Sequence, residues 1–169
     1  MRRLLKLPPF LFLLMMPFAY ANAAELAAPK GQVILTISGD IEHRNGAQAA
    51  DFDREMLEQL GIESFETKTP WYEGQVKFEG VRLSKLMKLV GAKGTNVTAV
   101  ALNDYVTTIP LEDFDKFPVL LALKRNGNYM PVRDKGPLFI IYPFDTFADL
   151  RTQTYFGRSA WQLRKLIIE

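Results

Sequence analysis

The sequence contains no cysteine and a single histidine among its 169 residues. The absence of cysteine excludes disulfides, thiolate nucleophiles, thiolate-bound metals and iron–sulfur clusters. The one histidine, His43, lies in a polar stretch, and no serine stands in a Gly-x-Ser-x-Gly motif, so a Ser-His-Asp hydrolase is not indicated. A zinc centre would also lack its usual nitrogen and sulfur ligands. The domain must therefore be stabilised by its apolar core alone.

Long apolar runs are absent except near the N-terminus. There a basic start is followed by the apolar run Phe10–Met16 and by Ala21-Asn22-Ala23, which has the small-x-small pattern of a signal-peptidase site. The apolar run is too short to span a bilayer. We therefore predict a signal peptide cleaved after Ala23, a periplasmic or secreted mature protein, and no stable membrane anchor after cleavage.

Net charge is also small once this leader is removed. The leader carries Arg2, Arg3 and Lys6 and no acid, so cleavage changes the formal charge from +2 to −1. A nearly neutral chain gives no indication of nucleic-acid binding. The remaining sequence is typical of one globular domain: we predict a flexible lead-in over 24–32 and a single domain over 33–169.

The hydrophobic pattern predicts many short strands and a few helices. Apolar and β-branched runs indicate strands near 33–38, 64–67, 76–78, 96–102, 105–109, 119–123, 138–141 and up to 168. Helical spacing indicates helices over 51–60, with Asp51 as N-cap, and over 83–90, with a short helical turn over 110–114. We expect loops at 40–50, 69–74 and 145–157, and turns at 79–80 and 126–127. This order predicts an α+β domain of mixed sheets with two or three short helices, rather than a βαβ fold.

One stretch organises the rest of the domain. Gly136-Pro137 predicts a bend, and Leu138 to Ile141 then forms an apolar run typical of a strand buried on both faces. Arg133 and Lys135 precede that strand, where a scaffold commonly presents groups that bind ligands.

Several ordered motifs give the sequence a family resemblance. They are Phe78-Glu79-Gly80-Val81-Arg82-Leu83, Ala101-Leu102-Asn103-Asp104-Tyr105, Asn126-Gly127, Arg133-Asp134-Lys135-Gly136-Pro137-Leu138 and Arg158-Ser159-Ala160-Trp161. In this order they resemble the oxidoreductase molybdopterin-binding domain of the sulfite-oxidase type, over roughly Val33 to Glu169. The likeness is to short exported bacterial members of that family. The resemblance implies the fold and a molybdopterin cofactor.

The sequence departs from the catalytic members at one position that matters. Those members hold molybdenum through the pterin dithiolene and a protein cysteine, which the resemblance implies near Glu66 to Thr69. Here that segment contains threonines and no cysteine. A threonine hydroxyl is a hard, un-ionised ligand and does not replace a soft thiolate. We therefore assign no catalytic and no metal-binding residues, and leave open whether the chain is an enzyme.

Nine residues are candidates for binding a ligand, in three groups. The first group, Asn103, Asp104 and Tyr105, joins two predicted strands. Either Asn103 and Asp104 contact a ligand and Tyr105 forms a wall of its site, or the three residues form a plain turn. The second group is basic. Arg133 and Lys135 could bind a phosphate or carboxylate, with Arg158 completing the cluster, or they could be solvent-exposed charges paired with Asp134. Trp71, Tyr142 and Trp161, with Tyr72, either line a flat slot for a ring system or belong to the core.

Three functions are consistent with these features. The first is a soluble, non-catalytic periplasmic protein that binds a small anionic ligand or a protein partner, as in envelope sensing. The second is an oxidoreductase that retains molybdopterin, held by Asn103, Arg133 and Lys135, without a protein thiolate on the metal. The third is a structural component of an envelope complex. We expect six of the candidate residues to converge on one cleft: Trp71, Asn103, Tyr105, Arg133, Lys135 and Arg158.

Overall fold

The computed structural model describes residues 26–169, so the predicted leader and its cleavage site lie outside the described residues. The strands are β1 (Leu35–Gly39), β2 (Ala49–Phe52), β3 (Glu63–Thr69), β4 (Tyr72–Arg82), β5 (Asn96–Ala101), β6 (Val106–Pro110), β7 (Leu120–Arg125), β8 (Asn128–Tyr129), β9 (Phe139–Ile141) and β10 (Leu163–Ile168). The helices are α1 (Arg54–Gln59), α2 (Leu83–Val90), α3 (Asp113–Lys116) and α4 (Gln153–Arg158), with 3₁₀ turns η1 (Val132–Asp134) and η2 (Ala148–Leu150).

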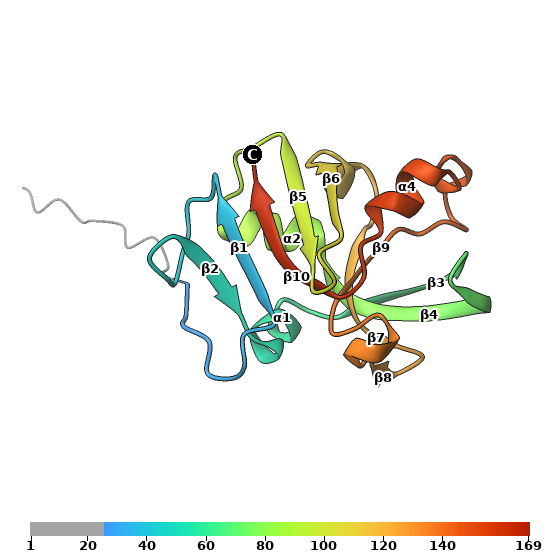
Figure 1. The fold of residues 1–169 in the computed structure, drawn as a ribbon, viewed down its shortest axis with the longest axis horizontal. Coiled ribbons are helices and arrows are strands. Elements are labelled where there is room, and N and C mark those ends of the chain that lie inside the picture. Colours follow the sequence, from blue (N-terminus) through green and yellow to red (C-terminus); the bar gives the residue numbers. More distant parts are fainter. Residues whose placement is uncertain (1–25) are drawn as a thin grey trace, which may run out of the picture.

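These strands form two sheets. The first has the order β2-β1-β10-β5-β6, in which only β1 and β10 run parallel. The second has the antiparallel order β3-β4-β7-β8, and β9 also pairs with β7. In Figure 1 the first sheet has α2 behind it, and the β3–β4 hairpin extends away from it to the right. The α+β prediction with mixed sheets and short helices is confirmed.

Two predicted elements explain how the core is filled. Leu138 and the three residues of β9 are fully buried, as the uninterrupted apolar run predicts. Helix α2 buries Leu83, Leu86, Met87 and Val90 on one face, which is the predicted stripe. It ends at Gly91, whose φ of 63° is the left-handed conformation that glycine adopts without penalty.

The first helix begins two residues later than predicted. Asp51 lies in β2, where we had expected the end of a loop and the start of the helix, and Asp53 is the N-cap: its Oδ1 accepts a hydrogen bond from the Met56 N–H at 2.9 Å. The Oδ2 atom of Asp53 also accepts from the N–H groups of Lys30 and Gly31, both at 2.8 Å. These backbone hydrogen bonds lower the pKa of the Asp53 carboxyl, that from Met56 most strongly. One carboxylate thus caps α1 and ties the end of the lead-in to it.

The second sheet contains a longer strand than the sequence indicated. We expected a turn at Glu79-Gly80, but β4 continues through it with an irregular register. A Cβ at Gly80 would lie 2.0 Å from the Leu121 carbonyl oxygen, so this glycine permits close approach of β7 and does not form a turn. The expected loop over 69–74 is likewise mostly strand, because β3 ends at Thr69 and β4 starts at Tyr72.

Two further segments differ from their predictions. The 145–157 segment, expected to be irregular, contains η2 and most of α4. The predicted helical turn at 110–114 is displaced, since Pro110 ends β6 and α3 starts at Asp113. Within residues 26–169 no helix is long and apolar enough to cross a membrane.

Candidate functional site

Three residues with unusual backbone conformation lie at one end of the first sheet. Asp104, Lys135 and Gln162 have φ values of 63°, 63° and 53°, although none of them is glycine. Such conformations cost free energy for residues with a Cβ and often cluster at functional sites. The remaining non-glycine case among residues 26–169 is Asn126, in the hairpin turn that the sequence predicted.

Gln162 connects the turns that carry the other two residues. Its N–H donates to the Lys135 carbonyl at 2.9 Å, and its side-chain amide donates to the Val132 carbonyl at 2.7 Å. Its own carbonyl accepts from the Leu102 N–H at 2.8 Å. One side chain and its backbone therefore fix the 132–135 turn against the turn that follows β5. Sequence reasoning missed Gln162, and its only signal was its position beside Trp161.

Lys135 lies between two aromatic rings. Its Nζ is 4.7 Å from the Trp161 ring centroid and 5.6 Å from that of Tyr72. Within the described part of the chain, no carboxylate lies within 4.0 Å of this ammonium group. The neighbouring Asp134 is instead paired with Arg125 at 2.7 Å, so Lys135 is not neutralised by the acid beside it.

Tyr72 contacts the 132–135 turn through Asp134. Its hydroxyl donates to Asp134 Oδ1 at 3.2 Å, and the Arg125 guanidinium carbon lies 4.2 Å from its ring centroid. Burial, with a smaller contribution from Asp134, raises the pKa of Tyr72 to about 12. The phenol therefore remains a hydrogen-bond donor at neutral pH.

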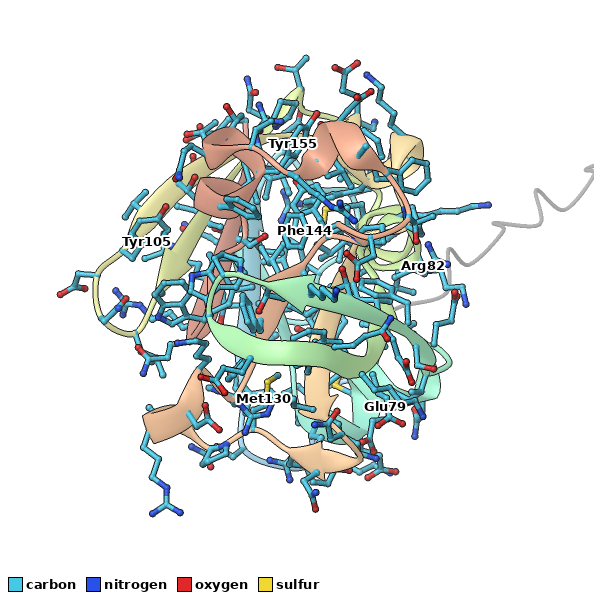
Figure 2. All side chains as sticks on the ribbon, turned by 90° about the vertical axis from the view of Figure 1, so that its right-hand side faces the viewer. Glu79, Arg82, Tyr105, Met130, Phe144 and Tyr155 are labelled. Atoms are coloured by element: carbon cyan, nitrogen blue, oxygen red, sulfur yellow. The ribbon has the colours of Figure 1, made fainter. Side chains whose placement is uncertain are left out.

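Tyr105 completes the arrangement. Its ring is nearly parallel to that of Trp161, with an interplanar angle of 5° and a centroid distance of 6.4 Å. Its hydroxyl donates to the Gly157 carbonyl at 2.7 Å, which ties the turn after β5 to α4. Figure 2 looks onto this side of the molecule, with Tyr105 at the edge of the view. We call Lys135 and the rings of Tyr72, Tyr105 and Trp161 the Lys135 shelf.

The flat slot predicted between the large aromatics is filled by Trp71 itself. Its ring contacts those of Phe139, Phe144, Phe156 and Trp161 at centroid distances of 5.4, 6.3, 6.1 and 5.5 Å. These rings meet edge to face or tilted, a geometry that packs aromatic cores and leaves no parallel gap. Trp71 therefore supports the shelf from inside, and Tyr105 is its exposed wall, with 44% of its surface accessible.

Tyr142 and Arg158 lie apart from Lys135, in a separate buried network. Tyr142 is fully buried, and its hydroxyl donates to Asp113 Oδ2 at 2.9 Å. Arg158 donates to the same oxygen at 2.8 Å. Burial, with a smaller effect of Asp113, raises the pKa of Tyr142 far above its usual range. The expectation that Tyr142 lines a slot and that Arg158 joins Lys135 is corrected by this geometry.

The other three predicted residues lie on turns beside the shelf. The Asn103 side chain accepts a hydrogen bond from the Tyr105 N–H at 3.2 Å, which is the plain-turn arrangement. Asp104 is exposed and pairs with Arg164 at 3.4 Å. Arg133 is exposed, one residue beyond Val132. The structure therefore brings together Trp71, Tyr105, Lys135 and Trp161, with Asn103, Asp104 and Arg133 at their edge.

In the segment where the resemblance implies the metal ligand, Thr67 is hydrogen-bonded to the backbone around it. This side chain is fully buried: its hydroxyl accepts from the Asp145 N–H at 3.0 Å and donates to the Lys68 carbonyl at 3.4 Å. Asp145 accepts from the Lys68 N–H and from Arg151, both at 2.8 Å. A cavity of about 360 Å³ lies beside them, lined by Lys68, Thr69, Pro70, Phe144, Asp145, Arg151 and Phe156.

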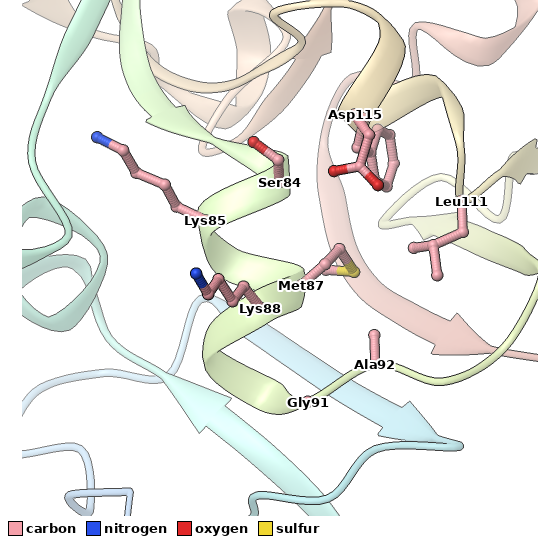
Figure 3. A pocket seen from close by; sticks show the side chains of 9 residues that line it. Ser84, Lys85, Met87, Lys88, Gly91, Ala92, Leu111 and Asp115 are labelled. Carbon is pink, nitrogen blue, oxygen red and sulfur yellow. The ribbon is translucent and has the colours of Figure 1, made fainter.

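A different hollow of about 480 Å³ lies between α2 and α3 (Figure 3). Met87, Leu111 and Phe114 form its apolar lining, and Lys85 and Lys88 lie on the helix beside it. Lys85 is paired with Glu63 at 2.8 Å, and this contact is the main cause of the lowered pKa of the Glu63 carboxyl. None of the nine residues predicted to bind a ligand lines this hollow.

The fold and the comparison with protein families agree. Residues 41–148 match the oxidoreductase molybdopterin binding domain, which covers more than half of the chain. The chain therefore belongs to the molybdopterin-binding oxidoreductase domain family, as its motifs indicated. No curated protein matches the sequence.

The family implies molybdopterin, and the residues present do not fit a protein-bound molybdenum centre. The sequence has no cysteine, and the hydroxyl of Thr67, within the segment where the resemblance implies the metal ligand, is already engaged by two backbone groups. Residues 26–169 also contain no cluster of three or more His, Asp or Glu side chains placed to hold a metal ion. No catalytic step through the cofactor follows from this arrangement.

Proposed function

We propose that this chain is a non-catalytic binding protein built on the molybdopterin-binding fold, and that its Lys135 shelf receives a small organic anion. The observation that carries the proposal is the Lys135 ammonium group, 4.7 Å from the Trp161 ring centroid with no carboxylate within 4.0 Å among residues 26–169. Its N–H donors suit a carboxylate or phosphate, and the adjacent rings suit a planar apolar group. A ligand that combines the two uses both parts of the shelf.

The backbone of the shelf supports a binding role. Lys135 and Gln162 both hold a left-handed conformation that is unfavourable for their residue types. Three hydrogen bonds of Gln162 maintain it. Strain of this kind persists where the surrounding structure over-determines the backbone, and here the turn that is held in place carries the Lys135 ammonium group. A preorganised turn has less backbone to order when an anion binds.

The chemistry of the former metal-ligand segment supports the absence of catalysis. Molybdenum is a soft-ligand centre in the catalytic members, and neither Thr67 nor Thr69 offers a thiolate. The N-terminal segment supports export, because its basic start, apolar run and Ala21-Asn22-Ala23 sequence have the order of a secretory signal. We propose that the binding protein acts in the periplasm or outside the cell.

Anion binding is tested on the mature chain, residues 24–169, with a panel of aromatic carboxylates and their uncharged primary amides. Both tryptophans of the sequence, Trp71 and Trp161, belong to the aromatic cluster, so their emission reports on it. We expect at least one carboxylate to bind and its amide to bind at least about tenfold more weakly, the loss of one charged hydrogen bond. Equal affinity for acid and amide, or no binding in the panel, would contradict the proposal.

A matched pair of variants assigns the binding to Lys135. Lys135→Met removes the ammonium group and keeps a long, flexible side chain, so anion binding should be lost. Lys116→Met is the control, because its ammonium also lies over a ring, 5.7 Å from the centroid of Phe117, but on α3. Binding that survives in the first variant, or disappears in both, would refute the assignment.

The alternative function, an oxidoreductase that retains molybdopterin, is tested by purifying the mature protein from a host that makes the cofactor. Metal analysis should find molybdenum far below one atom per chain, with no pterin released on denaturation. Stoichiometric molybdenum and pterin would replace our proposal with the alternative.

A further inference from the structure

A groove lies beside the shelf, at the same end of the first sheet. Its volume is about 500 Å³. Its lining comes from four separate segments, the strand β1 with the residues before it, the turn around 102, the turn over 132–137, and the start of β10: Gln32, Val33, Ile34, Leu35, Thr36, Leu102, Val132, Pro137, Leu163, Arg164 and Lys165. Nothing in the family resemblance assigns a role to this groove.

The rim of the groove exposes large apolar side chains. Val33, Leu102 and Val132 are 42%, 46% and 50% exposed, and each comes from a different segment. Isolated exposed apolar residues are ordinary, but their concentration around one groove is typical of an interaction site.

The walls of the groove are fixed in place by Gln162. Its side chain donates to the Val132 carbonyl at 2.7 Å, and its backbone carbonyl accepts from the Leu102 N–H at 2.8 Å. The backbone positions of Val132 and Leu102, whose apolar side chains are exposed, are therefore held relative to each other by Gln162. A preformed groove requires little rearrangement on binding.

The floor of the groove leaves backbone available. The parallel pairing of β1 with β10 begins at Thr36 opposite Lys165, so the residues before Thr36 have no strand beside them on the β10 side. Among residues 26–169, the Val33 N–H and carbonyl have no hydrogen-bond partner. An extended peptide can satisfy such groups by adding to the strand, whereas a lipid chain cannot.

The charge around the groove is positive. Arg164 and Lys165 line it, and Arg133 follows Val132. Asp104 pairs with Arg164 at 3.4 Å, Asp134 pairs with Arg125 at 2.7 Å, and Asp51 accepts from the Thr36 hydroxyl at 2.6 Å, so among residues 26–169 no carboxylate lies within 4.0 Å of the Arg133 or Lys165 cation. A complementary occupant carries carboxylates around its apolar side chains.

We propose that this groove docks an extended segment of a partner protein, in which apolar side chains are flanked by aspartate or glutamate. The apolar side chains contact Val33, Leu102 and Val132, the peptide backbone pairs with Val33, and the carboxylates face Arg133 and Lys165. This interaction is separate from the anion on the Lys135 shelf.

The test is a selection of peptides from a phage-displayed library of random 16-residue sequences on the purified mature chain. Selected peptides are synthesised with a fluorescent label, and their affinity is measured by fluorescence polarisation. We expect sequences with apolar residues at alternate positions and neighbouring carboxylates, and affinity that weakens as salt increases. Val132→Asp and Leu102→Asp should each weaken binding at least tenfold, because they place a carboxylate in the apolar groove.

Ile62→Asp is the matched control, because Ile62 is 40% exposed and precedes β3, and it should leave peptide binding within twofold. Unchanged circular dichroism of all three variants confirms that they are folded. The proposal is overturned by failure to select peptides, by selected peptides that lack carboxylates, or by binding that ignores both groove variants.

Two other occupants are outcomes of the same experiment. Binding of phosphatidylglycerol vesicles that Val132→Asp abolishes would indicate a membrane surface, and a dimer that Val132→Asp dissociates on gel filtration would indicate a second copy of the chain. Either result would replace our proposal. Failure at the groove is distinguishable from failure at the shelf, because labelled peptide reports on the first and tryptophan emission on the second.

Discussion

Single residues decide the geometry of the shelf, and Gln162 is the clearest case. It adopts a φ of 53°, where the Cβ of an L-residue is crowded, and it makes three hydrogen bonds to the two turns around it. Nothing in the local sequence predicted this role, because glutamine has no preference for the left-handed region. Trp161 beside it was a candidate because of its residue type and its place in the family motif.

Substitution of Gln162 separates its backbone strain from its side-chain bond. Gln162→Ala and Gln162→Gly both remove the donor to Val132, but only glycine adopts the left-handed conformation freely. We therefore expect the glycine variant to unfold at a higher urea concentration than the alanine variant, by about 1 kcal/mol in the free energy of unfolding. Equal stability of the two variants would show that the backbone at this position is not strained.

Tyr72 gives the molecule a dependence on alkaline pH. Because its pKa is about 12 in the folded state, against a reference value of 10.0, the folded state favours the neutral phenol. Its contribution to stability is fully present below pH 10 and is lost as the pH rises through 12. Tyr142, whose pKa is also raised, acts in the same direction.

The prediction is that unfolding free energy falls between pH 10 and 12 and falls less steeply in Tyr72→Phe. Urea denaturation at several pH values measures the slope, and the phenolate absorbance follows the titration itself. A titration curve unchanged by Tyr72→Phe over this range would contradict the raised pKa.

At the level of elements, short helices in this fold depend on contacts made far along the chain. α4 contains Gly157, lacks a side-chain N-cap, and was predicted to be loop. It is attached to α3 by the Arg158–Asp113 contact at 2.8 Å and to the turn after β5 by the Tyr105 hydroxyl. Local propensity did not predict α4 because its stability comes from these tertiary partners.

The Arg158–Asp113 pair is the element-scale prediction. Asp113 is 3% exposed, so Arg158→Met leaves a buried carboxylate with only the Tyr142 hydroxyl and should cost about 3 kcal/mol of stability. Adding Asp113→Asn removes the charge and keeps an oxygen for Tyr142, so the double variant should recover most of the loss.

Arg164→Met is the control for this pair. Its partner Asp104 has a side chain that is 89% exposed, so the loss should stay below about 1 kcal/mol. Denaturation midpoints measure all three variants. A double variant no more stable than Arg158→Met alone would show that the unpaired charge is not the cause of the loss.

The sequence predicted the elements whose pattern is local. The stripe of α2, the buried strand β9 and the Asn126-Gly127 hairpin were predicted because periodicity, an unbroken apolar run and positive-φ turn residues are local signals. β4 was cut short in the prediction, because Gly80 is typical of a turn and its close contact with Leu121 comes from tertiary structure. Asp51 was predicted as the cap of α1 from its residue type, and Asp53, which caps it in the structure, was not considered.

For the whole molecule, residue type selected the candidate residues, and the structure shows which of them lie together. Trp71, Tyr105, Lys135 and Trp161 come from distant segments, and the structure places them in one cluster. Arg158 and Tyr142 have the same kinds of side chain as these residues, but both donate hydrogen bonds to the buried Asp113 and so lie apart from them. The sequence gives no information on which partner a charged or phenolic side chain reaches first.

Export is the prediction at this scale. Expressed from its full sequence in a Gram-negative host, the protein should appear in the periplasmic fraction with Ala24 as its first residue, because Ala21-Asn22-Ala23 presents small residues to the peptidase. Intact mass spectrometry of that fraction measures the cleavage point. Full-length protein confined to the cytoplasm would contradict the proposed location.

The position of β10 has a consequence for how the chain reaches its native state. It inserts between β1 and β5, with Thr36 opposite Lys165, so the first sheet cannot close until its most sequence-distant strands meet. In the native sheet β10 alone joins the β1–β2 pair to the β5–β6 pair. Such long-range closure slows folding, which suits the export that we propose, because a secretion channel takes a polypeptide that is still unfolded.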